Sequence, residues 1–480
     1  MLTTLMLFPG VAALLLIFIP KDNQKLLYKL NIAVSLVPLI MVLLTWPMFS
    51  AQEPILSILE RKEWIPSLGV SYALRLDGVN LPFITMVTFL TVVVNLIPPV
   101  PGENLKKKSM LLLIWEATLI GGFLAQDYVL FLMFWAATTV PIYLLMEPST
   151  KPEKLTAARS YLLSGLVSIV ALGVGLLILS SSIDTPALAA EDLANTIITH
   201  LDPNTQWWVF LAIFVGCALR IPIFPFQIWL RLTIGHLPVS AGILLMGGFM
   251  PLGVYTLLRF ALMLLPDAMI AFTLVLAAAG AVNLIFGALA ALGAEERNQK
   301  AAYQSMVYTG IALLGMASNT MEAFTGSLYT LLALGTAMAF SLTLTHLTSG
   351  QTSLQGWPLV LYGLEAAQQL RLPGFPGFIG LLLVFSTASG GFPRVSLAII
   401  VALFFIAIDY ARFLAGIMQG PHRKEPTQPT DSCRTFRSPP LGTKMTAILL
   451  LSGSLLLGCG CELILGVIEP AITQIMPLLN

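Results

Sequence analysis

Two short motifs built from arginine and proline lie in the middle of apolar stretches long enough to cross a membrane. The first is Arg220-Ile-Pro-Ile-Phe-Pro225 and the second is Arg371-Leu-Pro-Gly-Phe-Pro376. Proline removes a helix hydrogen bond and its ring clashes with the preceding turn, so each motif predicts a broken helix. The predicted break residues are Pro222, Pro225, Pro373 and Pro376. Non-helical backbone survives at membrane depth only where protein or a water-filled cavity covers it.

The two motifs stand in different halves of the chain. Interrupted helices at matching places in two halves are typical of transporters built from repeats, in which the ion path runs past the breaks. Short motifs also match by chance in a chain of 480 residues. Because each copy combines a cation with two prolines inside an apolar stretch, we favour the repeat.

The composition places the chain in a membrane. Hydrophobic residues make up 57% and charged residues 10%, and the mean hydropathy is +0.87. A soluble domain carries about 25% charged residues. The net charge of +1 gives no indication of a nucleic-acid partner. The four cysteines lack the spacing of zinc ligands, so no metal site is predicted.

Apolar runs near the ~20 residues needed to cross a bilayer recur along the chain. They predict an all-α polytopic membrane protein with about fourteen transmembrane helices, of which the seventh and the twelfth are broken. The spans are expected near residues 2–20, 30–48, 79–99, 109–125, 127–146, 157–181, 206–230, 238–258, 268–291, 301–317, 323–347, 357–388, 394–418 and 445–468.

Lysine and arginine orient these spans. Odd-numbered loops carry 17 of the 25 Lys and Arg residues, and even-numbered loops carry five, among them Arg259. Cytoplasmic loops are enriched in these residues, so we expect odd loops in the cytoplasm and both termini on the opposite side. The Pro- and Ser-rich segment 421–442 is then a cytoplasmic connector.

The three other Lys and Arg residues and several acids fall inside predicted spans, where a charge is costly enough to indicate function. They include Glu116, Arg220, Glu365, Arg371, Asp409 and Arg412. Asp409 and Arg412 stand three apart on one helix face, so they are expected to pair locally. Glu116 has no cation on its own helix, and we expect it to form the central ion pair with Arg220. Asp409 is also the first candidate partner of Arg371.

In the second half, Glu365 and Arg371 flank the break and should combine with the amides of Gln368 and Gln369. Asp127, near the start of a span, is expected to be a helix cap. All twelve lysines lie in loops or at span edges. Arginine stays protonated, so the arginines at the breaks can bias a path electrostatically but do not carry a proton.

Five segments carry a family resemblance: Trp64–Pro82, Gly121–Asp127, Phe134–Tyr143, Pro222–Leu230 and Leu372–Phe378. They resemble the antiporter-like M subunit (chain 4, or D) of respiratory complex I and of its photosynthetic relatives, and the D subunit of multisubunit cation/proton antiporters. The resemblance implies fourteen spans with two inverted five-helix repeats, spans 4–8 and 9–13. It implies one transmembrane domain over 1–480: three N-terminal spans (1–108), the repeats (109–258 and 268–418), the loop 421–442, and the last span with a tail (445–480).

The chain departs from this family at the residues that relay protons. Aligned by motif, the family's fifth-span Glu is Ala136 and its seventh-span Lys is Arg220. The eighth-span Lys falls at Pro251 and the twelfth-span Glu at Leu381, whereas the fourth-span acid is kept as Glu116. Proton pumping by this subunit itself is therefore in doubt.

The resemblance implies a membrane-arm subunit of a proton-translocating NAD(P)H– or ferredoxin–quinone oxidoreductase. Its partners would be other membrane subunits and lipid, in a thylakoid or bacterial plasma membrane. NAD(P)H or ferredoxin, iron–sulfur clusters and quinone are expected in other subunits, with no cofactor and no catalytic residue in this chain. The alternatives are a subunit of a multisubunit cation/proton antiporter and a non-pumping structural subunit of a carbon-uptake variant.

Overall fold

The structure is a computed structural model. It describes residues 1–20, 22–49, 57–100, 103–146, 152–182, 201–262, 265–349, 354, 356–391, 393–418 and 441–475. The predicted connector 421–442 lies outside these residues except for its last two, which begin a helix.

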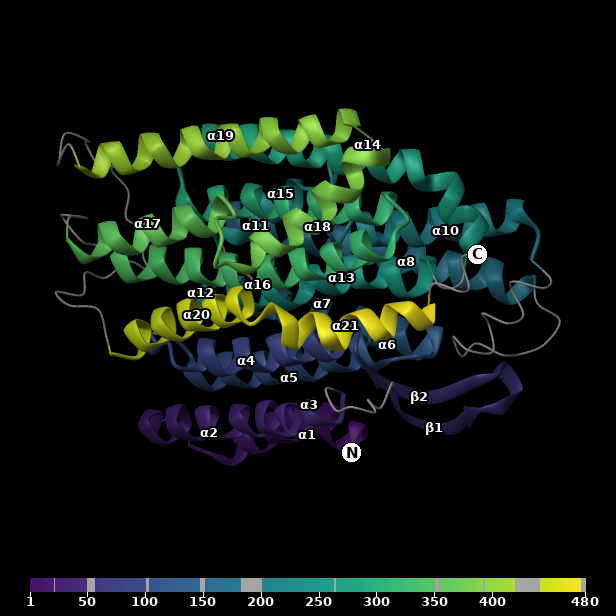
Figure 1. The fold of residues 1–480 in the computed structure, drawn as a ribbon. Coiled ribbons are helices and arrows are strands. Elements are labelled where there is room, and N and C mark those ends of the chain that lie inside the picture. Colours follow the sequence, from purple (N-terminus) through teal and green to yellow (C-terminus); the bar gives the residue numbers. More distant parts are fainter. Residues whose placement is uncertain are drawn as a thin grey trace.

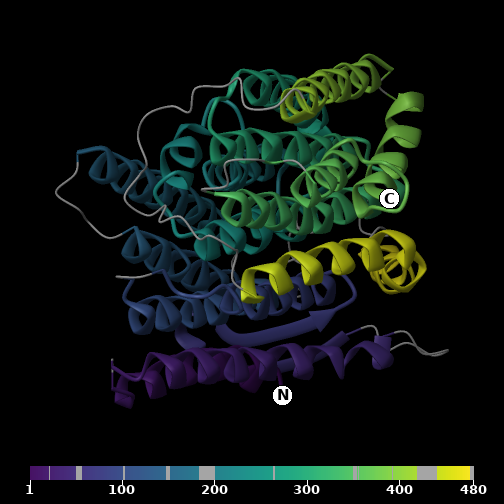
Figure 2. The ribbon, with the colours of Figure 1, turned by 90° about the vertical axis from the view of Figure 1, so that its left-hand side faces the viewer.

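Long helices run side by side in stacked layers (Figures 1 and 2). One outer layer contains α1 (Leu2–Leu15) and α2 (Gln24–Leu43), and the opposite one contains α14 (Pro266–Gly293) and α19 (Pro393–Met418). Between them lie α4 (Leu81–Asn95), α5 (Leu105–Leu124), α15 (Arg297–Ala317) and α16 (Met321–Thr348). Because a helix satisfies its own backbone hydrogen bonds, apolar sequences of this kind form helices in lipid.

Eight helices of the described residues are long and apolar enough to cross a membrane. They are Gln24–Phe49, Tyr128–Leu145, Pro152–Ser181, Val239–Phe260, Asp267–Gly293, Met321–Thr348, Ser396–Met418 and Leu441–Cys459. Three shorter apolar helices accompany them, at Leu2–Phe18, Leu81–Asn95 and Pro376–Ala388. The chain is thus a mostly helical, multi-pass membrane protein.

A β-hairpin corrects the all-α prediction. β1 (Ser57–Ile65) pairs antiparallel with β2 (Val70–Asp77), and Gly69 turns the chain between them at a φ of +66°. The charged residues of β1 hid this strand, because they interrupt the apolar alternation that marks one. Glu60 ties the hairpin to α1 by accepting hydrogen bonds from the amides of Leu2 and Thr3, at 2.8 and 3.0 Å.

The end of β2 is fixed by a buried ion pair. The Asp77 carboxylate lies 2.7 Å from the Arg259 guanidinium and accepts hydrogen bonds from the amides of Val79 and Asn80, both at 3.1 Å. Arg259 is buried in a helical segment, so its predicted place in an external loop is wrong. In the sequence Arg259 directly follows an apolar run, so it was predicted as the first loop residue after that span. The ion pair with Asp77 instead holds it inside the protein.

The helix containing Arg259 is irregular at two places. α12 (Val239–Leu244) widens into a π-helix at Leu245–Phe249, continues as α13 (Met250–Thr256), and widens again at Leu257–Leu262. Pro251 cannot donate to the carbonyl of Gly247 and would clash with it in a regular helix, which accounts for the first widening.

The last two helices pack on the interrupted segment after α17 (Trp357–Gln369). α20 (Leu441–Cys459) and α21 (Cys461–Ile475) meet at Gly460 and cross the front of the bundle (Figure 1). A Cβ atom added at Gly458 would lie 2.1 Å from the Gly374 carbonyl oxygen, so only glycine permits this contact. The Tyr329 hydroxyl donates to the neighbouring Leu457 carbonyl.

We expect Gly458→Ala to destabilise the protein by about 1–3 kcal/mol, because the added methyl group forces α20 away from backbone atoms that have no room to yield. The matched control is Gly466→Ala in α21, where nothing lies within 4 Å of the added Cβ. That change should be neutral or stabilising by up to about 1 kcal/mol. Thermal unfolding of both purified variants measures the difference; equal midpoints would contradict the packing account.

Candidate functional site

Two breaks interrupt helices where the arginine–proline motifs lie. α10 (Pro203–Ala218) ends before the first motif, and α11 (Ile228–Ile234) begins after it. α17 ends at Gln369, before the second motif, and α18 (Pro376–Gly391) begins at its last proline. The amide of Phe224, freed by the first break, donates to the Asn283 side chain on α14 at 3.1 Å.

Arg220 is enclosed by neutral groups. Its Nη2 donates to the Trp135 carbonyl at 2.6 Å and to the Thr139 hydroxyl at 2.8 Å, and its Nη1 donates to the Thr138 hydroxyl. The guanidinium carbon also lies 4.2 Å from the Trp135 ring centroid and 4.4 Å from that of Phe249. Trp135, Thr138 and Thr139 lie at the junction of α6 (Tyr128–Ala137) and α7 (Thr139–Leu145), whereas Phe249 ends the π-helix that follows α12. Arg220 therefore joins the α6–α7 kink to the first break.

The predicted ion pair between Glu116 and Arg220 is wrong. Glu116 is fully buried on α5, and neither of its carboxylate oxygens has a hydrogen-bond partner. The Thr91 hydroxyl faces it from α4, but that hydroxyl donates to the Val87 carbonyl at 2.9 Å. The physical reason is that α6 and α7 supply acceptors to both terminal nitrogens of the Arg220 guanidinium, and only Nε has no hydrogen-bond partner.

Arg371 is buried at the second break but is less well satisfied. Its Nη1 donates to the Gln369 carbonyl at 3.1 Å, and its guanidinium carbon lies 4.3 Å from the Tyr308 ring centroid. Nε and Nη2 have no hydrogen-bond partner. The Arg371 backbone has a φ of +55°, which is uncommon for a residue with a side chain. Gln368 donates to the Ser454 hydroxyl on α20 at 2.7 Å.

Both predicted partners of Asp409 are wrong. Its carboxylate lies 2.6 Å from the Lys300 ammonium at the start of α15. Arg412 lies on the exposed face of α19, and Arg371 donates to the Gln369 carbonyl at the second break. The three-residue spacing on one helix suggested a pair between Asp409 and Arg412. Asp409 instead pairs with Lys300, which comes from another helix.

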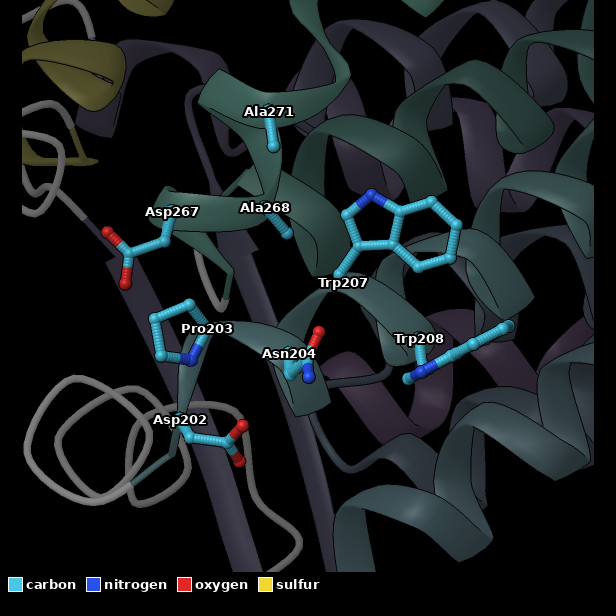
Figure 3. A pocket seen from close by; sticks show the side chains of 8 residues that line it. All are labelled: Asp202, Pro203, Asn204, Trp207, Trp208, Asp267, Ala268 and Ala271. Carbon is cyan, nitrogen blue, oxygen red and sulfur yellow. The ribbon is translucent and has the colours of Figure 1, made fainter.

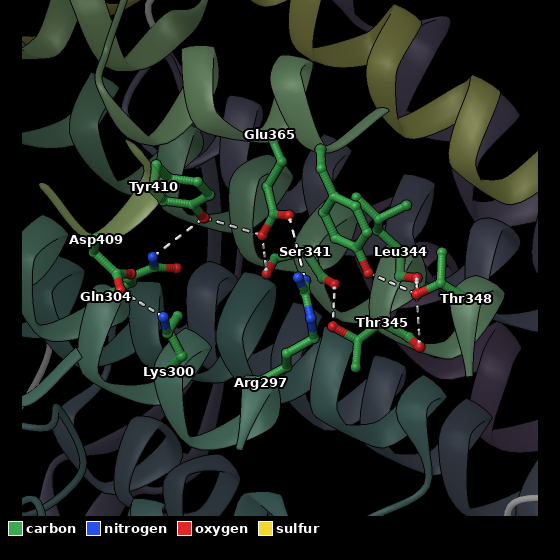
Figure 4. Close-up of polar contacts among 11 residues, drawn as sticks. Arg297, Lys300, Gln304, Ser341, Leu344, Thr345, Thr348, Glu365, Asp409 and Tyr410 are labelled. Atoms are coloured by element: carbon green, nitrogen blue, oxygen red, sulfur yellow. Dashed lines mark hydrogen bonds and ion pairs between the residues drawn. The ribbon is translucent and has the colours of Figure 1, made fainter. Parts of the chain in front are cut away.

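Glu365 lies in a polar cluster formed by α15, α16, α17 and α19 (Figure 4). One carboxylate oxygen accepts hydrogen bonds from Ser341 at 2.6 Å and from Tyr410 at 3.1 Å. The other lies 4.0 Å from Arg297. The predicted spans leave Arg297 and Lys300 in a loop, so their ion pairs with Glu365 and Asp409 were not predicted. The signal that could have indicated them is their three-residue spacing directly before an apolar helix, which places both on one helix face.

Asp127, by contrast, is the helix cap that the sequence predicts. It accepts hydrogen bonds from the amides of Val129 and Leu130 at the start of α6, at 2.9 and 3.2 Å. It also accepts one from the Ser71 amide of β2 at 2.9 Å. The cap therefore holds the hairpin against the helix that leads to the Arg220 site.

A shallow pocket lies away from the breaks, where α10 and α14 begin (Figure 3). It is lined by Asp202, Pro203, Asn204, Trp207, Trp208, Asp267, Ala268 and Ala271. A hydrogen bond from the Thr205 hydroxyl lowers the pKa of Asp202, and Gln206 donates to Asp267 at 3.1 Å. Both acids are thus engaged by neighbouring residues.

Both breaks reach the molecular surface. Side chains are 43% exposed at Phe224 and 39% exposed at Phe226, and Leu372 at the second break is 46% exposed. The arginines point inward at the same places. Each break therefore has a buried cation on one side and exposed apolar residues on the other.

These features define a class of protein: a helical multi-pass membrane protein with arginine-bearing breaks at two places. Residues 125–356 match the family described as NADH:quinone oxidoreductase/Mrp antiporter, transmembrane. This part of the chain is therefore similar to the membrane subunits that the family describes.

Three known proteins illustrate the similarity. NAD(P)H-quinone oxidoreductase chain 4 1 of Synechococcus elongatus is 29% identical over 419 residues, which cover 82% of this chain and 77% of the relative. A chain of respiratory complex I from Thermus thermophilus superposes with a TM-score of 0.83 at 21% identity and 100% coverage of both chains. A chain of the Mrp complex from Dietzia sp. gives a TM-score of 0.79 at 19% identity, covering 100% of this chain and 55% of that one.

We expect Arg220→Lys to lower the free energy of unfolding by about 1–3 kcal/mol, because an ammonium group cannot reach the same acceptors while lying against two rings. Arg231→Lys on the exposed face of α11 is the matched control and should have little effect. Thermal unfolding of the purified complex is the measurement. Equal stability of the two variants would contradict the described role of Arg220.

Proposed function

We propose that the chain is a D/M-type membrane-arm subunit of an NAD(P)H– or ferredoxin–quinone oxidoreductase. The name of its relative from Synechococcus elongatus supports this proposal, as does the likeness to a complex I chain over the whole length. NAD(P)H or ferredoxin, iron–sulfur clusters and quinone would then be bound by other subunits.

The observation that carries the proposal is the exposure of both breaks. Lipid tails offer no hydrogen bonds, so irregular backbone at membrane depth must be covered by protein or by water. Phe224, Phe226 and Leu372 are apolar, which favours protein over water. A chain with two such surfaces is suited to lie between neighbouring membrane subunits.

The finer architecture belongs to the same proposal. The chain would have about fourteen spans, with inverted repeats over spans 4–8 and 9–13 and within residues 109–258 and 268–418. The excess of Lys and Arg in odd loops supports a topology with both termini on the non-cytoplasmic side. The host membrane would be a thylakoid or a bacterial plasma membrane.

Neighbouring subunits at the breaks are testable by photo-crosslinking. With p-benzoylphenylalanine in place of Phe226 or Leu372, irradiation of native membranes should yield adducts of this chain with other membrane subunits of the oxidoreductase. The same probe at Leu274, exposed on the unbroken helix α14, measures chance capture. Lipid adducts alone at both breaks would contradict the proposal, and adducts with antiporter subunits would support the alternative host complex.

We further propose that this subunit does not move protons by the family's lysine relay. The motif alignment puts Ala136, Arg220, Pro251 and Leu381 where that relay has its titratable groups. Arginine does not release a proton at ordinary pH. Within the described residues, Lys300 is held by Asp409 at a helix start rather than beside a break.

The number of protons moved per electron pair tests this point. Fully assembled Arg220→Ala and Glu116→Gln complexes should match the native complex in that ratio when reconstituted in vesicles. Electron transfer and subunit content are measured in the same preparations. A lower ratio with unchanged electron transfer would show that these residues take part in pumping.

The second candidate is a subunit of a multisubunit cation/proton antiporter, which the family match and the similarity to an Mrp chain favour. The proteins that co-purify with a tagged chain decide between the two. Quinone oxidoreductase subunits support the first function and antiporter subunits the second.

A further inference from the structure

The Glu365 carboxyl group has two unlike oxygens. Oε1 accepts hydrogen bonds from the hydroxyl groups of Ser341 at 2.6 Å and Tyr410 at 3.1 Å, whereas Oε2 has no hydrogen-bond partner. Only 4% of the Glu365 side chain is exposed. A buried oxygen without a partner needs either a proton of its own or a donor that moves to it.

Arg297 is placed to be that donor. Its Nη1 lies 4.0 Å from Oε2, outside hydrogen-bonding distance. Its guanidinium carbon lies 3.9 Å from the ring centroids of both Tyr362 and Phe413, which meet edge to face. A movement of about 1 Å would replace the aromatic contact by a charge-assisted hydrogen bond to Glu365.

The charged groups next to Glu365 and Arg297 determine the net charge of the cluster (Figure 4). Lys300 on α15 and Asp409 on α19 form their own ion pair at 2.6 Å. Tyr410, next to Asp409, accepts a hydrogen bond from Gln304 at 3.2 Å and is therefore oriented to donate to Glu365. With Arg297, the cluster is neutral when Glu365 is ionised and has one positive charge when Glu365 is protonated.

The cluster also has a route to the surface. The side chains of Arg297 and Lys300 are 27% and 21% exposed, whereas Glu365 is buried behind them. Water at the start of α15 can therefore reach the cation that faces Oε2. The site differs from the position where the resemblance expects an acid, because Leu381 lies beyond the second break on α18.

We propose that Glu365 exchanges a proton with water at this edge and that Arg297 alternates between Oε2 and the two aromatic rings as it does so. When the O–H bond at Oε2 breaks, the proton passes to water and Arg297 Nη1 forms a hydrogen bond to Oε2. When hydronium returns the proton, that bond is lost and Arg297 returns to Tyr362 and Phe413. The inference rests on the proposed function only for its link to electron transfer.

Infrared difference spectra after a pH jump, recorded on the purified native complex, test the exchange directly. A carboxyl C=O band should appear on acidification and be absent in Glu365→Gln. Guanidinium bands that change together with this carboxyl band should be absent in Arg297→Gln, because Arg297 is the cation that moves. Glu322→Gln, at the exposed start of α16, is the control and should keep both the carboxyl and the guanidinium bands.

A native carboxyl band that persists in Glu365→Gln would overturn the proposal, and so would guanidinium bands that change in Arg297→Gln as they do in the native complex. These readouts do not depend on which complex contains the chain. Failure of the proposed function is seen separately, when a tagged chain co-purifies without oxidoreductase subunits. If both hold, Glu365→Gln should also lower the number of protons moved per electron pair in vesicles, and an unchanged ratio would contradict the link to electron transfer.

Discussion

Hydrogen bonds from Arg220 connect the first break to the junction of α6 and α7. A broken helix and a buried cation are each costly inside a membrane. The Trp135 carbonyl and the hydroxyls of Thr138 and Thr139 solvate the guanidinium. Two irregular segments thus satisfy each other, and the Asp127 cap that begins α6 ties the hairpin to the same unit.

The two breaks resemble each other in sequence and differ in how they are satisfied. Arg220 has acceptors from two other helices, whereas Arg371 bonds to the carbonyl of its near neighbour Gln369 and leaves two nitrogens without a partner. Polar interactions of the second half are instead concentrated around Glu365. This asymmetry supports our view that the second half has its own chemistry rather than a copy of the first.

The sequence predicts features that depend on local physics. Prolines mark both interruptions, apolar runs mark the helices, and Asp127 stands where a cap is needed. Partners of charged side chains could not be predicted, because they come from distant helices: Lys300 and Asp409 are 109 residues apart, and Arg220 and Thr138 are 82 apart. The hairpin was missed because charged residues in β1 conceal its alternation. Whether Glu116, Arg220, Glu365, Arg371 and Asp409 form a proton path stays a prediction.

We propose that protein covers each break on both of its sides. A high-resolution map of the chain in its native complex would show the groups that lie against the breaks. We predict protein density from neighbouring subunits against Phe224 to Phe226 and against Leu372 and Pro373, with Arg220 still bonded to α6 and α7. Acyl-chain density along both breaks, or a Glu116 carboxylate in contact with Arg220, would contradict the account.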